Sequence, residues 1–447
     1  MKERANEIGR LTVVFAAVLL FLFVSNAQAT IDGISGPSFS LAARADHIST
    51  ADGGSLLLWG YANGAGRAQY PGPTLIVTQG ETVTVALTNN LSGVNTSIVF
   101  PGQEAVTAVT NGGPCANQGL LTCEAVPGRT VTYSFTAANP GTYLYYSGTN
   151  PELQVEMGLV GALIVRPLMG PNYAYGHAGT KFDREYMFLL SEMDPRIHQK
   201  VEFQGVAALA STDYLSDYQP NYWFINGRTA PDDIDAPGAA ILPTQPYGSL
   251  VLMRPGERVL MRVIGAGRDS HPFHHHGNHA RVIARQGRLL ESAPGAGPDI
   301  SHEVFTINSI PGETVDAIFE WTGKDLGWDI YGTAADGRAH TCKDTNPADG
   351  YADADAQFPM EYCADHYKPF PVTLPETQFI AVGPFYSGSP FMGAAGTLPP
   401  GEGGLNPWSV FPFMWHSHNE RELTNFNIFP GGMLTMLIIV PPNTPIP

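Results

Sequence analysis

The sequence contains one strand-and-turn pattern twice, and this internal repeat constrains the fold more than any other feature. Each copy begins with Gly-Glu-x-Val, continues through a Pro-Gly-x-Thr-Val turn and ends in an apolar strand. These segments are residues 80–83, 127–131 and 161–165 in the first copy, and 256–259, 311–315 and 436–440 in the second. Such a repeat predicts two related domains built in the same way.

The repeated segments have the pattern of strands. Residues 82–87 and 130–135 alternate or run apolar, are rich in β-branched side chains and are bounded by glycine and proline. The 447-residue chain holds 49 glycines and 37 prolines, which would interrupt the helices of a bundle. Hydrophobic residues make up 43% of the chain, which excludes intrinsic disorder. We therefore expect an all-β protein.

The repeat also sets the expected domain boundaries. The first domain should span residues 31–167, and the second should span residues 180–447. The second copy is longer because residues 322–412 separate its strands. That segment is rich in Gly, Pro and Asp, and it predicts a long, loop-rich insertion.

Residues 1–29 have the organisation of a secretory signal peptide. A basic start precedes an apolar run at residues 11–24 and a small-x-small cleavage site that ends at Ala29. The run is short for a membrane span, so we expect none after cleavage. The protein should be exported to the periplasm, the extracellular space or the cell surface. Its net charge of −17 argues against a nucleic-acid partner.

The four cysteines form two local pairs. Cys115 lies close to Cys123, and Cys342 and Cys363 bracket an acidic loop. An even number of cysteines in an exported chain predicts two disulfides that staple loops. Thiolate metal ligands are the less favoured alternative, because neither pair forms a Cys-x-x-Cys motif.

Two His-x-His pairs lie in equivalent places of the second copy. Residues i and i+2 of a strand point to the same face, so His274 projects with His276 and His416 projects with His418. Imidazoles that converge from two neighbouring strands predict a copper or zinc site. The alternative is a polar, histidine-rich surface. His275 should point to the opposite face and is not expected to be a ligand.

These residues resemble motifs of the multicopper oxidase family. Residues 271–277 (HPFHHHG) resemble its HPxHxHG motif, and residues 416–418 resemble its HCHxxxH motif. Residues 98–102 and 144–148 occupy the places of its first-domain motifs. The resemblance implies two cupredoxin-like domains, each a Greek-key β-barrel or sandwich, and copper as the cofactor.

The departures from the family pattern are as informative as the match. The resemblance places Ser417 where type 1 copper has its Cys and Glu422 where it has a His. Only His271 remains of that trio, as a weaker ligand candidate, and Met433 is a shifted axial residue. A hydroxyl cannot replace the thiolate of a blue-copper site. The first-domain ligand positions hold non-ligands or poor ligands: Val99, Pro101, Tyr146 and Gly148.

The resemblance therefore implies an oxidoreductase with one or few coppers rather than the full four. Ordinary laccase activity is not expected, and whether the protein is an enzyme stays open. Glu420 and Glu422 are weak candidates for proton donors, and a solvated charged turn is the favoured interpretation of these residues. A non-catalytic copper carrier and an envelope structural protein are competing functions. Two-domain relatives commonly assemble as trimers, so the resemblance implies a homo-oligomer. Every first domain of a homotrimer lacks the ligands, so a different partner protein is the expected way to complete the site.

The loop between Cys342 and Cys363 suggests calcium. Carboxylate and amide oxygens at this density suit Ca²⁺, although the spacing is one residue away from the usual loop. A solvated acidic loop closed by a disulfide is the alternative. The candidate calcium ligands are Asp344, Asn346, Asp349, Asp353 and Asp355.

Overall fold

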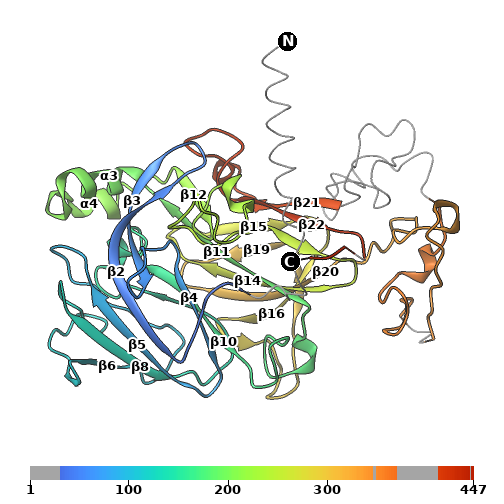
Figure 1. Cartoon of the computed structure of the whole chain (residues 1–447), viewed down its shortest axis with the longest axis horizontal. Coiled ribbons are helices and arrows are strands. Elements are labelled where there is room, and N and C mark those ends of the chain that lie inside the picture. Colours follow the sequence, from blue (N-terminus) through green and yellow to red (C-terminus); the bar gives the residue numbers. More distant parts are fainter. Residues whose placement is uncertain (1–30, 346–348, 370–410, 443, 447) are drawn as a thin grey trace, which may run out of the picture.

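The computed structural model describes residues 31–345, 349–369, 411–442 and 444–446 (Figure 1). The expected signal peptide and residues 370–410 of the insertion lie outside this part of the chain. Strands dominate the described residues and form four sheets, so the all-β prediction is confirmed. No helix among the described residues is long and apolar enough to cross a membrane.

The first two sheets are built from residues 34–166. One has the order β1-β4-β10-β9 and the other the order β3-β2-β5-β8-β6-β7. The strands are β1 (Ile34–Ser35), β2 (Ser38–Ser49), β3 (Ser55–Asn63), β4 (Gly72–Thr78), β5 (Thr82–Asn89), β6 (Thr107–Thr110), β7 (Gly113–Pro114), β8 (Thr130–Thr136), β9 (Gly141–Tyr146) and β10 (Val160–Arg166). Alternate side chains of β5 and β8, such as Val83, Val85 and Tyr133, are buried in one shared core.

The other two sheets are built from residues 184–439. Their orders are β12-β11-β14-β20-β16-β17, with β18 beside β16, and β13-β22-β21-β15-β19. The strands are β11 (Arg184–Met193), β12 (Tyr222–Ile225), β13 (Val251–Met253), β14 (Arg258–Gly265), β15 (His271–His275), β16 (Ala280–Arg285), β17 (Arg288–Leu289), β18 (His302–Val304), β19 (Thr306–Ser309), β20 (Thr314–Glu320), β21 (Phe411–Ser417) and β22 (Leu434–Ile439).

Among the described residues, helices are short and lie in the connections. The α-helices are α2 (Pro151–Gln154), α3 (Pro195–Gln204) and α4 (Ser211–Leu215), and the 3₁₀ helices are η1 (Ala178–Thr180), η2 (Val206–Ala208), η3 (Asp232–Ile234), η4 (Ala334–Asp336), η5 (Cys363–Asp365) and η6 (Glu420–Leu423). The Asp194 carboxylate accepts a hydrogen bond from the Arg196 N–H, and Pro195 occupies the first turn of α3. This capping arrangement explains a helix that the strand pattern did not predict.

The two halves share a buried interface. Apolar residues from both sides, such as Leu144, Ile164 and Leu189, form one cluster. Polar contacts cross it as well: Arg262 on β14 donates to Glu185 at 2.9 Å and to Thr142 of the first half at 2.8 Å. Glu185 also pairs with Arg166 of β10. Because these charges are buried together, they hold the halves in one arrangement.

The start of the insertion packs on the second half. Trp328, Ile330 and Tyr331 belong to the same buried cluster as Phe273 and Trp415. Both predicted disulfides are present, Cys115–Cys123 and Cys342–Cys363. The second closes a loop that ends at η5.

Candidate metal centre

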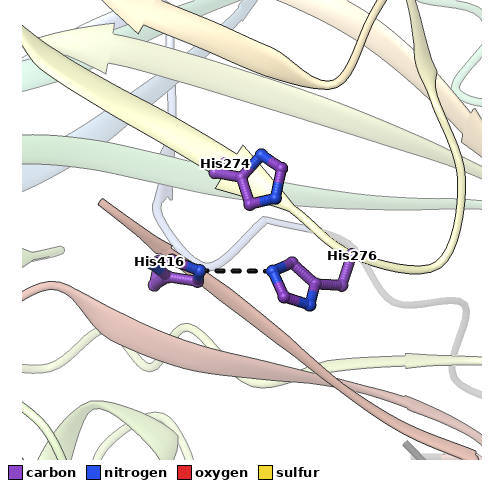
Figure 2. Close-up of side chains that lie close together, drawn as sticks. All are labelled: His274, His276 and His416. Carbon is purple, nitrogen blue, oxygen red and sulfur yellow. Dashed lines mark hydrogen bonds between the residues drawn. The ribbon is translucent and has the colours of Figure 1, made fainter. Parts of the chain in front are cut away.

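Strands β15 and β21 bring the two His-x-His pairs together. They are antiparallel neighbours, and His274 lies directly opposite His416. The backbone of His276 continues the pairing, because its N–H donates to the Met414 carbonyl. Alternation along each strand puts His274, His276 and His416 on one face of the sheet, where their rings point toward one another (Figure 2).

The three rings are close enough to share a metal ion. One ligand nitrogen from each of His274, His276 and His416 lies within 4.8 Å of the others. The Nε2 atoms of His276 and His416 are 3.3 Å apart. His418 lies at the rim: its ring centroid is 5.1 Å from that of His274, but 55% of its side chain is exposed and its Nδ1 lies 3.3 Å from Glu420.

Hydrogen bonds behind the rings orient them. His416 donates from Nδ1 to the Ser417 carbonyl at 2.7 Å, so a neutral ring presents its Nε2 lone pair to the cluster. The Nδ1 of His274 lies 3.0 Å from the Thr306 hydroxyl. The Nδ1 of His276 is buried and has no hydrogen-bond partner among the described residues. Outer partners of this kind fix the ring positions of metal-binding histidines.

Burial and mutual repulsion keep the cluster uncharged. Burial, together with the neighbouring imidazoles, lowers the pKa of His274 to about 4 and that of His276 to about 4. The pKa of His416 is lowered for the same reasons. Neutral imidazole is the form that binds metals, so protons do not compete for these nitrogens at pH 7.

His275 points to the other face, as its position in the strand predicts. It is fully buried, and its Nε2 lies 3.1 Å from the Val304 carbonyl and 3.0 Å from the Ala280 nitrogen. Phe319 and Trp415 pack against its ring. His275 is therefore a core residue.

His271 lies on the same inner face as His275, away from the cluster. Its Nε2 is 2.9 Å from Glu192 and its Nδ1 is 3.0 Å from Glu422. The two carboxylates outweigh the effect of burial and raise the pKa of His271 to about 9. The ring is thus an imidazolium held between two glutamates. The structure does not bring it together with the metal-ligand candidates, because both of its nitrogens already bind carboxylates.

Glu422 completes this buried network. The Ser417 hydroxyl donates to its Oε2 at 2.5 Å, and the Asn419 side chain donates to its Oε1 at 2.9 Å. Only 2% of Glu422 is exposed, so the expectation of a solvated turn is wrong for this residue. Its carboxylate is engaged with His271 and does not face the cluster. Glu420, in contrast, is 79% exposed.

Glu192 is a buried partner of His271 that the sequence did not reveal. It lies on β11, and its Oε1 accepts the backbone N–H of Arg268 at 2.6 Å. Gly267 passes so close that a Cβ there would overlap the carboxylate. The nearby glycine is the only local sequence signal, and it does not specify which acid approaches it.

The equivalent positions of the first half are filled by packing. The backbones of Val99 and Tyr146 form a β-bridge, with the Val99 N–H donating to the Tyr146 carbonyl at 2.8 Å. A Cβ on Gly148 would lie 2.7 Å from the Val99 side chain. Pro101 is half-buried beside them in the chain. This region offers side-chain contacts in place of metal ligands.

The acidic loop does not gather its carboxylates among the described residues. Asp353 accepts hydrogen bonds from Thr345, Asp355 pairs with Lys343, and Asp349 accepts the Tyr351 N–H at 3.0 Å. Asn346 lies outside the described residues.

A separate group of side chains in the insertion was not predicted from the sequence: Asp329, His340, Glu361 and His366. The sequence does hold one indication of this group, because His340, Glu361 and His366 each lie within three positions of a paired cysteine.

The paired sandwiches and the imidazole cluster define a cupredoxin-like protein with a candidate metal centre. Residues 59–169 match the family model of multicopper oxidases. This match covers most of the first half and supports the resemblance to multicopper oxidases that the histidine motifs carry.

Parts of the chain are similar to curated oxidases. L-ascorbate oxidase of Cucurbita pepo var. melopepo is 33% identical over 36% of this chain and 26% of that protein. The iron transport multicopper oxidase FET3 of Saccharomyces cerevisiae is 38% identical over 22% of this chain and 15% of that protein. These matches span about a quarter or less of each relative.

The fold likeness covers nearly the whole chain. The blue copper oxidase from Nitrosomonas europaea has a TM-score of 0.53 at 19% identity, over 90% of this chain and 85% of that one. The multicopper oxidase mgLAC has the same TM-score, over 92% of this chain and 87% of that one. The cupredoxin-like architecture implied by the sequence is confirmed.

Proposed function

We propose that the protein is an exported, copper-binding oxidoreductase that works with a reduced set of coppers. The observation that carries this proposal is the convergence of three neutral imidazoles, His274, His276 and His416, at positions where the family motifs place ligands. His418 stands at the rim as a fourth ligand. A copper ion bound there would supply one-electron redox chemistry and a coordination position for a small molecule.

The residues at the type 1 position do not fit copper. Ser417 offers a hydroxyl in place of a thiolate, and its Oγ already donates to Glu422. His271 is protonated and bound at both nitrogens. Electrons therefore do not enter the protein at this position. Laccase-type turnover, in which electrons enter at type 1 copper, is not expected.

Neighbouring residues orient the imidazole rings and keep their ligand nitrogens unprotonated. Thr306 and the Ser417 carbonyl hold two rings in place, while burial keeps the ligand nitrogens unprotonated. Phe305 lies beside His274, with ring centroids 6.0 Å apart, and shields that side from water although its outer surface is 53% exposed. Relatives named for ascorbate and for iron transport make small reductants and metal ions the first substrate classes to test.

A second candidate function is a subunit whose copper site a partner completes. It is favoured by His418, whose half-exposed side chain leaves the cluster open at its rim. In a homotrimer the facing domain would again bring Val99 and Tyr146, so a different partner protein is the stronger form of this proposal. A non-catalytic copper carrier would use the same open side to release its ion.

Export is proposed from the amino-terminal sequence and the disulfides. Residues 1–29 have the pattern of a signal peptide, and both cysteine pairs are oxidised in the structure. Disulfides persist in oxidising compartments. The periplasm and the cell surface are the two locations to distinguish, by fractionation of cells.

Metal analysis after copper loading tests the proposal. Purified protein should retain about one copper per chain after desalting, as expected for preformed imidazole ligands. Less than about a tenth of a copper per chain would refute the metal site. Oxygen uptake with ascorbate, Fe²⁺ or a phenol then separates an oxidase from a carrier, which binds copper but consumes no oxygen.

A further inference from the structure

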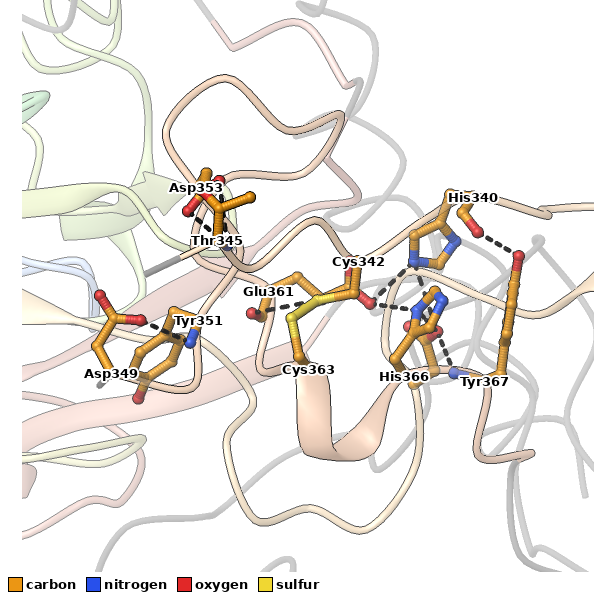
Figure 3. Close-up of a disulfide and its surroundings, with 11 residues drawn as sticks. His340, Cys342, Thr345, Asp349, Tyr351, Asp353, Glu361, Cys363, His366 and Tyr367 are labelled. Carbon is orange, nitrogen blue, oxygen red and sulfur yellow. Dashed lines mark hydrogen bonds and ion pairs between the residues drawn. A yellow bond between two sulfur atoms is a disulfide. The ribbon is translucent and has the colours of Figure 1, made fainter. Parts of the chain in front are cut away.

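A second group of metal-binding side chains lies in the insertion, independent of the proposed copper site. Asp329, His340, Glu361 and His366 each offer one ligand atom, and these atoms lie within 4.8 Å of one another. The first three residues are buried, and only 18% of the His366 side chain is exposed. Figure 3 shows His340, Glu361 and His366 beside the Cys342–Cys363 disulfide.

The contacts of His340 direct its second ring nitrogen toward two carboxylates. His340 donates from Nδ1 to the Arg338 carbonyl at 3.0 Å, so a neutral ring directs its Nε2 lone pair inward. That Nε2 lies 3.0 Å from Glu361 Oε1 and 3.5 Å from Asp329 Oδ2. A lone pair and two carboxylate oxygens repel each other in a buried site unless a positive charge lies among them.

The second imidazole approaches the same two oxygens. His366 Nδ1 lies 2.7 Å from Glu361 Oε1 and 3.5 Å from Asp329 Oδ2. The other oxygen of Glu361, Oε2, is buried and has no hydrogen-bond partner in the described part of the chain. Leaving a buried carboxylate oxygen unpaired is costly, and a metal ion would satisfy it.

The surrounding structure holds the four side chains in place without an ion. Asp329 accepts the backbone N–H groups of Tyr331 and Tyr367, each at 2.9 Å. The disulfide joins Cys342, two residues after His340, to Cys363, two residues after Glu361. Asp329 itself lies between two core residues, Trp328 and Ile330. Ligands that are positioned before binding favour a specific site.

We propose that this group binds a divalent transition-metal ion that fastens the insertion to the second domain. Two imidazole nitrogens and two carboxylate oxygens suit Zn²⁺, and four protein ligands in a mostly buried place are typical of a structural zinc site. Ca²⁺ is the wrong ion for it, because calcium takes six to eight oxygen ligands. The ion links Asp329, anchored in the core, to the three ligands that lie within three residues of the Cys342–Cys363 disulfide.

Zinc retention tests this site apart from the copper cluster. The full chain carrying His274→Ala and His416→Ala is stripped with EDTA, incubated with Zn²⁺, desalted and analysed for metal. We expect about one zinc per chain and a higher melting temperature with zinc than without it. Adding His366→Ala should reduce the retained zinc at least tenfold and remove the rise in melting temperature.

Matched variants complete the experiment. Asp355→Asn changes an exposed carboxylate of the same loop, paired with Lys343, and should retain its zinc. Glu361→Gln should lose zinc as His366→Ala does; if it fails to fold, the partly exposed His366 still provides the test. Less than a tenth of a zinc per chain in the His274/His416 background, or unchanged retention after His366→Ala, would show an ion-pair cluster only and overturn the proposal.

Discussion

Two groups of histidines on opposite faces of β15 and β21 differ in the groups that surround their rings, and therefore in their pKa values. On the outer face of β15 and β21, His274, His276 and His416 face one another, and burial with mutual repulsion lowers their pKa values. On the inner face, His271 lies between two glutamates that raise its pKa to about 9. The outer imidazoles are therefore neutral, whereas the inner imidazole is charged and both of its nitrogens contact carboxylates. The neighbouring charges, rather than the residue type, therefore decide which site can take a metal ion.

The largest effect should come from the outer face. In a His366→Ala background, which removes a ligand of the insertion site, His274→Ala or His416→Ala should lower the copper retained after desalting from about one per chain to less than about a tenth, because each removes a ligand from the three-imidazole group. His275→Ala is the matched control, because that ring faces the core and should leave the copper content unchanged. Equal copper loss in all three variants would contradict the assignment of faces.

Two substitutions should convert the inner face into a copper site. Ser417→Cys with Glu422→His introduces a thiolate and a second imidazole beside His271, the ligand types of a blue-copper site. The copper-loaded double variant should gain the intense visible absorption of a copper–thiolate bond, which the natural protein should lack. A blue natural protein would show that another residue supplies the thiolate.

Removing one carboxylate from the inner network should destabilise the fold. Glu422→Gln leaves the His271 imidazolium with one partner and disturbs the Ser417 hydrogen bond, which should cost about 3 kcal/mol at pH 7. Urea unfolding measures the loss. Glu420→Gln, at an exposed neighbouring position, should leave the unfolding midpoint unchanged; a comparable loss there would point to a general charge effect.

The contribution of the His271 network to the free energy of unfolding should depend on pH. Because the pKa of His271 is raised from 6.5 to about 9 in the folded protein, its stabilisation is complete below pH 6.5 and is lost as the pH rises through about 9. The stability difference between the natural protein and His271→Gln should therefore narrow by about 3 kcal/mol across this range. A constant difference from pH 6 to pH 10 would mean that the ring is neutral.

The sequence predicts what depends on short-range periodicity. Strand alternation places His274 with His276, and the repeat indicates that His416 lies on the neighbouring strand. Local spacing also predicts both disulfides. The departures at Ser417 and Glu422 indicate in advance that the type 1 copper position is altered.

What the sequence does not predict depends on distant partners. Glu192 reaches His271 from another strand, and no local pattern links the two residues. Glu422 lies in a turn of charged residues, and only its buried partners show that it is not solvated. The four ligands in the insertion are spread from Asp329 to His366 without a regular spacing, so only the folded chain brings them together.

The contacts of Glu185 at the interface predict that the two halves of the protein cannot be produced separately. Arg166 of the first domain and Arg262 of the second both pair with Glu185, and Leu144 and Ile164 are buried against the second domain. Either half produced alone would expose this apolar surface and would lose the Arg166–Glu185 pair. The two domains should therefore melt in a single transition, and cutting the chain between residues 167 and 180 should yield insoluble halves.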